Sequence, residues 1–201
     1  MINVYLCATK LFKVKNLSNL IKKNNSKILT AAKGTKKNMG MIGNYIAVNS
    51  DTLKEIEEGS FDFFDADPDK YPALDIDKAW QVIHYMLCDG DIAEGEPPMG
   101  YVAPIREENA IDLEDLDYGA FLITNEQVKK AYDYIKNIDE DQFRSKYDME
   151  TLAEDGVYPV VEADKADADG FFEYIFNYLE QIKIFFKQAI DNKYGIIFYI
   201  L

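Results

Sequence analysis

Apolar residues recur along the chain at spacings of three and four, a pattern that predicts amphipathic helices. The longest is expected to open at Asp169–Gly170 and to end near Asn192. Another follows Thr124 and Gln127, which have the spacing of a capping box. The apolar faces of these two helices are Phe172, Ile175, Phe176, Leu179, Ile182, Phe186 and Ile190 for the first, and Val128, Ala131, Tyr132, Ile135 and Ile138 for the second.

Shorter helices are predicted elsewhere from their capping residues. One begins at Asn49 or Ser50 and stops at Gly59. Another begins near Asp75, a good N-cap, and runs to about Cys88. The stretch "DEDQFRSKYDMETLAEDG" favours two further short helices.

Strand-forming residues gather in three other stretches, "MIGNYIAV", "YGAFLIT" and "YGIIFYIL", with "VYPVV" as a brief extended piece. The closing stretch is apolar on both sides, which is typical of a central strand. Few strands and many helices, without regular βαβ alternation, predict an α+β fold. We expect a small mixed or antiparallel sheet of about three or more strands packed with several helices.

Charge divides the chain at Met39. Residues 1–38 hold nine of the 22 basic residues and no acid, whereas residues 39–201 hold 13 basic and all 36 acidic residues, a net of −23. We predict one domain over residues 39–201, preceded by a basic extension. The extension is expected to be disordered or to result from a mis-assigned start codon. The alternative is an arm that binds a membrane surface or nucleic acid. An acidic domain repels phosphate backbones, so we expect it to bind no nucleic acid.

Cysteine usage and the length of the apolar runs indicate where the protein resides. Cys7 and Cys88 form no C-x-x-C pair, and no Cys/His cluster has zinc-ligand spacing. No apolar run approaches the ~20 residues of a membrane span. These features predict a cytoplasmic protein without a membrane span or a structural metal.

The candidate chemistry lies in "LDIDKAWQVIHYMLCDGD", which holds the only tryptophan, Trp80, and the only histidine, His84. One hypothesis makes Asp77 and His84 an acid–base pair beside a Trp80 platform, with Asp89 and Asp91 as further ligand-binding residues. The alternative is a packed helix in which His84 bonds a neighbour. Asp77 and His84 are about 10.5 Å apart along a helix, too far for a direct hydrogen bond. The end of a helix would also raise the pKa of Cys88.

Two acidic loops resemble calcium-binding loops in part. "DADPDKYPALDI" has Asp65, Asp67 and Asp69 at the first ligand positions, but Lys70 replaces the glycine and Ile76 the glutamate that an EF-hand requires. "DKADADG" fails in a similar way. Glycine-rich phosphate loops are absent as well, so we predict no cofactor and no metal.

Several segments, in order, resemble the YfbM-like family, small bacterial proteins classed as a domain of unknown function. They are "MGMIGNY" at Met39, "LDIDKAWQVIHYML" at Leu74, "DYGAFLITNEQV" at Asp117 and "VYPVV" at Val157. The resemblance implies a compact α+β domain in the bacterial cytoplasm, and no activity or catalytic residue. Members typically begin at the stretch matching Met39, which supports a mis-assigned start. The segment Leu87-Cys88-Asp89-Gly90 departs from the family pattern, in which threonine more often precedes the glycine, so Cys88 is interpreted as incidental.

Two classes of function stay open. The first is a non-enzymatic acidic module that binds a basic protein, in its most concrete form as an immunity protein or antitoxin. The second is a small hydrolase or transferase, or a small-ligand binder, with a cleft around Asp77, Trp80 and His84. The absence of a nucleophile beside this group favours the first class.

Overall fold

The computed structural model describes residues 40–58, 60, 71–111 and 119–201. The predicted basic extension and the acids at 65, 67 and 69 lie outside these ranges. The strands are β1 (Gly43–Val48), β2 (Ala73–Asp75), β3 (Ala110–Ile111), β4 (Ala120–Ile123) and β5 (Gly195–Ile200). The helices are α2 (Ser50–Glu57), α3 (Trp80–Leu87), α4 (Asn125–Ile135), α5 (Glu140–Arg144), α6 (Met149–Glu154) and α7 (Ala168–Asp191), with short 3-10 turns η1 (Asp77–Ala79), η2 (Met99–Tyr101), η3 (Glu107–Asn109) and η4 (Glu162–Asp167).

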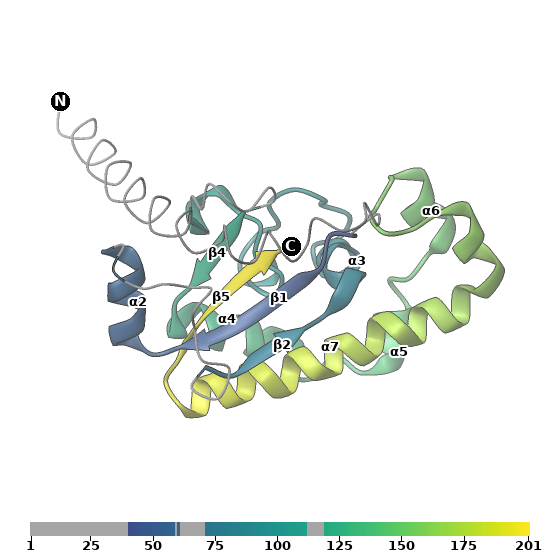
Figure 1. Cartoon of the computed structure of the whole chain (residues 1–201). Helices are drawn as coiled ribbons and strands as arrows, with labels where there is room; N and C mark the ends of the chain where they lie inside the picture. Colours follow the sequence, from purple (N-terminus) through teal and green to yellow (C-terminus); the bar gives the residue numbers. More distant parts are fainter. Residues whose placement is uncertain (1–39, 59, 61–70, 112–118) are drawn as a thin grey trace.

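The five strands form one sheet in the order β2-β1-β5-β4-β3, and every neighbouring pair is antiparallel (Figure 1). β5 is central, as its apolar sequence predicts, and Phe198 pairs with Tyr45 of β1 and Phe121 of β4. The predicted α+β fold, with a long helix followed by a last strand, is therefore confirmed.

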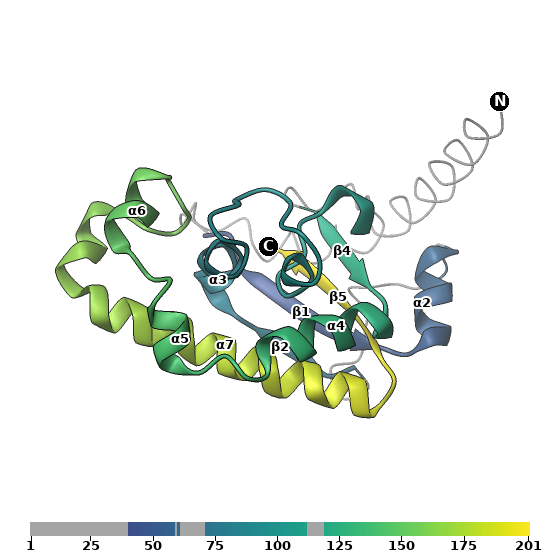
Figure 2. The same cartoon turned by 180° about the vertical axis from the view of Figure 1, so that it is seen from behind.

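The main core lies between the sheet and the helices α3, α4 and α7, as the two opposite views show (Figures 1 and 2). Alternate residues of β1, β4 and β5 face this core, among them Tyr45, Phe121 and Phe198. Their neighbours Ile46 and Ile197 face the other side of the sheet, in a smaller cluster that includes residues of α2. The period of two along each strand thus gives the sheet two apolar faces.

Two helices begin at the N-cap residues that the sequence predicts. The Asn49 side chain accepts amide hydrogens at the start of α2, and Thr124 with Gln127 forms a complete capping box on α4. α7 begins at Ala168, capped by Asp167, close to the predicted Asp169–Gly170.

Two local predictions differ from the structure. "VYPVV" is a turn rather than an extended piece, because the Val160 amide donates to the Val157 carbonyl at 2.9 Å. The Tyr158 amide donates to the Gln81 side chain. Asp75 ends β2, and its carboxylate accepts the Asp77 amide at 2.6 Å at the start of a 3-10 turn, so α3 itself begins only at Trp80.

Candidate functional site

Trp80 lies in the core at the start of α3, with only 5% of its surface exposed. Its indole Nε1 donates to the Met41 carbonyl at 3.1 Å, and its ring lies 6.5 Å from that of Phe198. A Cβ at Gly43 would come within 2.8 Å of the Trp80 Cβ, so the first residue of β1 approaches the helix at a distance that only glycine permits. Trp80 therefore joins α3 to the sheet.

His84 is fully buried one turn further along α3. Its Nδ1 lies 2.9 Å from the Ala103 carbonyl oxygen, which can only accept, so Nδ1 carries the hydrogen. Nε2 is then a lone-pair acceptor, and none of the described residues donates a hydrogen bond to it. Burial lowers the pKa of His84, against smaller opposing effects of the Ala103 bond and the Asp91 charge. The imidazole is thus held in its neutral form.

The loop after α3 closes over the Nε2 edge of His84. Gly95 lies there at φ +62°, and a Cβ on it would come within 2.5 Å of Cys88 Sγ and 3.0 Å of His84 Nε2. Asp91 holds this loop by accepting the Gly95 amide at 3.1 Å, and Arg106 donates to the Gly95 carbonyl at 2.5 Å. Hydrogen bonds from loop amides, that of Ala93 first, lower the pKa of Asp91. The predicted ligand residue Asp91 therefore organises the cover over His84.

Cys88 shares this covered region and is a poor nucleophile. Burial, together with the charges of Asp91 and Asp89, raises the pKa of its thiol to about 12. A neutral thiol reacts slowly, because the thiolate is the nucleophile. This direction agrees with the expectation from its place at a helix end.

Asp77 has a different partner from His84. It adopts φ +47°, and its Oδ2 accepts the Tyr174 hydroxyl of α7 at 3.0 Å. The same hydroxyl accepts the Lys78 amide at 3.2 Å. Burial and the bond to Asp77 raise the pKa of Tyr174. The structure thus joins Asp77 to α7 and His84 to Ala103, and the burial of both Trp80 and His84 favours the packed-helix alternative.

Asp89, by contrast, lines a cavity of about 290 Å³ at the end of α3. The other lining residues are Tyr85, Met86, Gly90 and Lys146. Lys146 Nζ donates to Asp89 Oδ1 at 2.7 Å, across 57 positions of sequence. Sequence reasoning proposed Asp89 but missed Lys146 and Tyr85. Tyr85 and Asp89 are four positions apart across the end of α3, and this spacing was the available signal.

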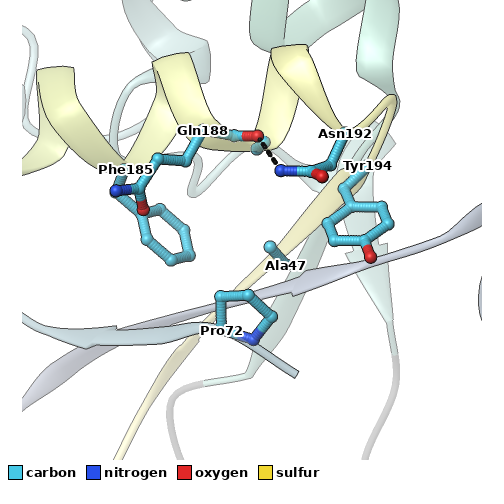
Figure 3. A pocket seen from close by; sticks show the side chains of 7 residues that line it. Ala47, Pro72, Phe185, Gln188, Asn192 and Tyr194 are labelled. Carbon is cyan, nitrogen blue, oxygen red and sulfur yellow. Dashed lines mark hydrogen bonds between the residues drawn. The ribbon is translucent and has the colours of Figure 1, made fainter. Parts of the chain in front are cut away.

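A second, smaller cavity of about 100 Å³ lies between β1 and the end of α7 (Figure 3). Asn192 there donates to the Gln188 carbonyl at 2.8 Å. Its lining includes none of the predicted site residues, and it is small compared with the ~300–1,000 Å³ of typical ligand pockets.

A strongly acidic part of the described chain is residues 139–169, which we call the acidic lobe. It comprises α5, α6, η4 and the start of α7, and stands at the end of the molecule opposite α2 (Figures 1 and 2). It holds eleven acidic and three basic residues, a net of −8. Each of the three cations is paired: Arg144 with Glu140 and Asp169, Lys146 with Asp89, and Lys165 with Glu150.

Neither a metal centre nor a membrane helix is found in the part of the chain that the structure describes. Over those residues, no group of three or more histidine, cysteine, aspartate or glutamate side chains could hold a metal ion. Of the helices described, none is long and apolar enough to cross a membrane.

Comparison with known proteins identifies a family and a fold, and indicates no activity. The model of a family described as "Domain of unknown function (DUF1877)" matches residues 39–199. The crystal structure of YfbM from Escherichia coli, a protein of unknown function, aligns with a TM-score of 0.62 at 19% identity, over 80% of this chain and 99% of that one. No curated protein matches the chain. At this identity the structural likeness shows a shared fold.

Proposed function

This chain belongs to the DUF1877 family of unknown function, and we propose that it is a non-enzymatic binding module whose acidic surface recognises a basic protein. In its most concrete form, it neutralises such a protein as an immunity protein or antitoxin does. One observation carries the proposal: the acidic lobe has a net charge of −8 and all its cations are already paired.

Several acidic residues of the lobe cap helices, and this role leaves their side chains negatively charged. Asp139, Asp148 and Asp167 cap the helices α5, α6 and α7. A capping carboxylate accepts amide hydrogens and stays an anion; indeed, hydrogen bonds from the Thr151 hydroxyl and neighbouring amides lower the pKa of Asp148. The negative field over the lobe therefore persists, and such a field attracts and orients a basic partner.

Two lobe acids allow a direct test of this field. Asp141 and Glu154 are exposed, and neither side chain makes a hydrogen bond or ion pair with the other described residues. We expect the wild type, immobilised at low ionic strength, to capture basic proteins from an extract of its native cells. The double variant Asp141→Asn/Glu154→Gln should retain less than half as much, because surface attraction weakens with each charge removed.

The matched control removes two charges at the opposite end of the molecule. Glu55 and Glu58 are exposed at the end of α2, so Glu55→Gln/Glu58→Gln has the same net charge as the lobe variant. It should capture as much as the wild type. Absence of any captured protein, or equal loss from both variants, would contradict recognition by the lobe.

A further inference from the structure

We infer that the cavity at the end of α3 is the subsite of this binding module that takes a guanidinium group, an arginine side chain of the basic partner. The inference rests on the proposed function and gives it a definite contact. The cavity lies where α3 meets the acidic lobe, since Tyr85, Met86, Asp89 and Gly90 come from the helix and its end, and Lys146 from the lobe.

Negative charge surrounds the cavity from three sources, one in its lining and two beside it. Asp89 contributes a carboxylate whose side chain is 75% exposed, and is therefore accessible to a partner. Asp155, the C-cap of α6, accepts the Tyr85 hydroxyl at 2.5 Å and places a second carboxylate beside that wall. The C-terminal end of α3 adds the negative pole of its dipole. The bond to Asp155, burial, and the Asp155 and Asp148 charges together raise the pKa of Tyr85 to about 12, which agrees with a negative field.

The backbone at the end of α3 brings Asp89 to the cavity. Asp89 at φ +54° and Gly90 at φ +95° are successive left-handed residues, and the Gly90 amide bonds back to the Tyr85 carbonyl. A Cβ at Gly90 would lie 3.6 Å from the Tyr85 hydroxyl, so the hydroxyl faces this turn. The turn therefore sets the Asp89 carboxylate and the Tyr85 hydroxyl around one space.

A cation of the chain itself already binds at this place. Lys146 Nζ is held 2.7 Å from Asp89, and its side chain is 35% exposed. Partial burial opposes its charge, but the bond to Asp89 and nearby charges raise the pKa of Lys146. A partner cation would displace this flexible lysine from Asp89.

The size and the two carboxylates favour guanidinium over other cations. The cavity volume of about 290 Å³ is close to that of the smallest ligand pockets and suits a single side chain. The planar fork of arginine presents five donors and can reach two acceptors at once, whereas an ammonium is a compact point charge. Met86 and the Tyr85 ring supply apolar surface for the methylene groups of the arginine stem.

The experiment is an NMR titration of the full chain with arginine amide, and with lysine amide for comparison. We expect saturable shifts at residues 85–90 and tighter binding of arginine amide. Lys146→Met should tighten binding about fivefold by removing the competing cation, and Asp89→Asn should weaken it about fivefold. Asparagine tolerates the left-handed conformation of Asp89, so that variant is expected to fold.

Matched variants separate the cavity from general charge. Lys54→Met and Glu58→Gln make the same charge changes at α2, at the end of the molecule opposite the lobe, and should alter the affinity less than twofold. Equal effects of the paired variants, or equal affinity for both amides, would overturn the guanidinium subsite and leave the acidic-lobe proposal standing. Absence of saturable binding of arginine amide would also overturn the subsite, while failure of the capture experiment would overturn the lobe.

Discussion

Replacing Trp80 by alanine is expected to lower the free energy of unfolding by about 3–5 kcal/mol, the usual cost of deleting a buried aromatic side chain. The ring is 5% exposed, packs on Phe198 and donates to Met41, so the variant loses contacts to two strands and the segment before them. Because many domains are stable by only about 5–15 kcal/mol, this loss is a large share of the total.

Urea unfolding followed by circular dichroism measures the effect of the Trp80 variant. Ile184→Ala is the control, since Ile184 is 62% exposed on α7 and should change stability by no more than about 0.5 kcal/mol. A Trp80→Ala variant that loses less than about 1 kcal/mol would show that this residue is not a core anchor, and would return it to the candidates for ligand binding.

Replacing His84 by alanine is expected to cost about 2–4 kcal/mol. The variant leaves a cavity and removes the donor from the Ala103 carbonyl, whose buried oxygen then lacks its partner. His84→Asn should cost less, because its amide can still donate toward Ala103. Equal losses for the two variants in urea unfolding would contradict a positioning role for the Nδ1 hydrogen bond.

The same residue gives a pH dependence of defined sign. Burial lowers the pKa of His84 in the folded state, so the unfolded chain binds the proton more readily. The contribution of His84 to the free energy of unfolding is therefore fully present above its unfolded-state pKa of about 6.5. It decreases as the pH falls toward the lower pKa of His84 in the folded state. Wild type should lose stability between pH 7 and pH 5.5, and His84→Asn should lose less over this range. A wild type that gained stability on acidification would contradict a neutral, buried imidazole.

These expectations divide α3 into two parts with different roles. Trp80 and His84 face the core, and their hydrogen bonds go to backbone carbonyls of neighbouring segments. Tyr85 and Asp89 lie toward the end of the helix and bond to the acidic lobe. The conspicuous tryptophan and histidine thus stabilise the fold, while the proposed binding surface begins where the helix ends.

The elements that could be predicted from the sequence are those with a local cause. The apolar stripe of α7 repeats with the period of a helix, and β5 is a continuous apolar run. The capping box of α4 depends on two residues three positions apart. β2 and β3 have three and two residues, too few for any period to show, and they form because β1 and β4 offer edges to pair with.

The candidate site depended on contacts that a single sequence does not display. Asp77 bonds to Tyr174 across 97 positions, and Asp89 to Lys146 across 57. Spacing along α3 could argue against a direct Asp77–His84 bond, but could not identify the partner that each residue has. It could place Asp89 at the end of a helix, without indicating that a lobe lysine would reach it.

Binding at the acidic lobe and the end of α3 is tested most directly by an NMR map of the isotope-labelled chain titrated with an arginine-rich peptide. We expect shifts concentrated at residues 85–90 and 139–169 that vanish as salt is raised toward 1 M, where the Debye length is about 3 Å. Shifts centred on α2, or on the loop over His84 with no change in the lobe, would contradict it.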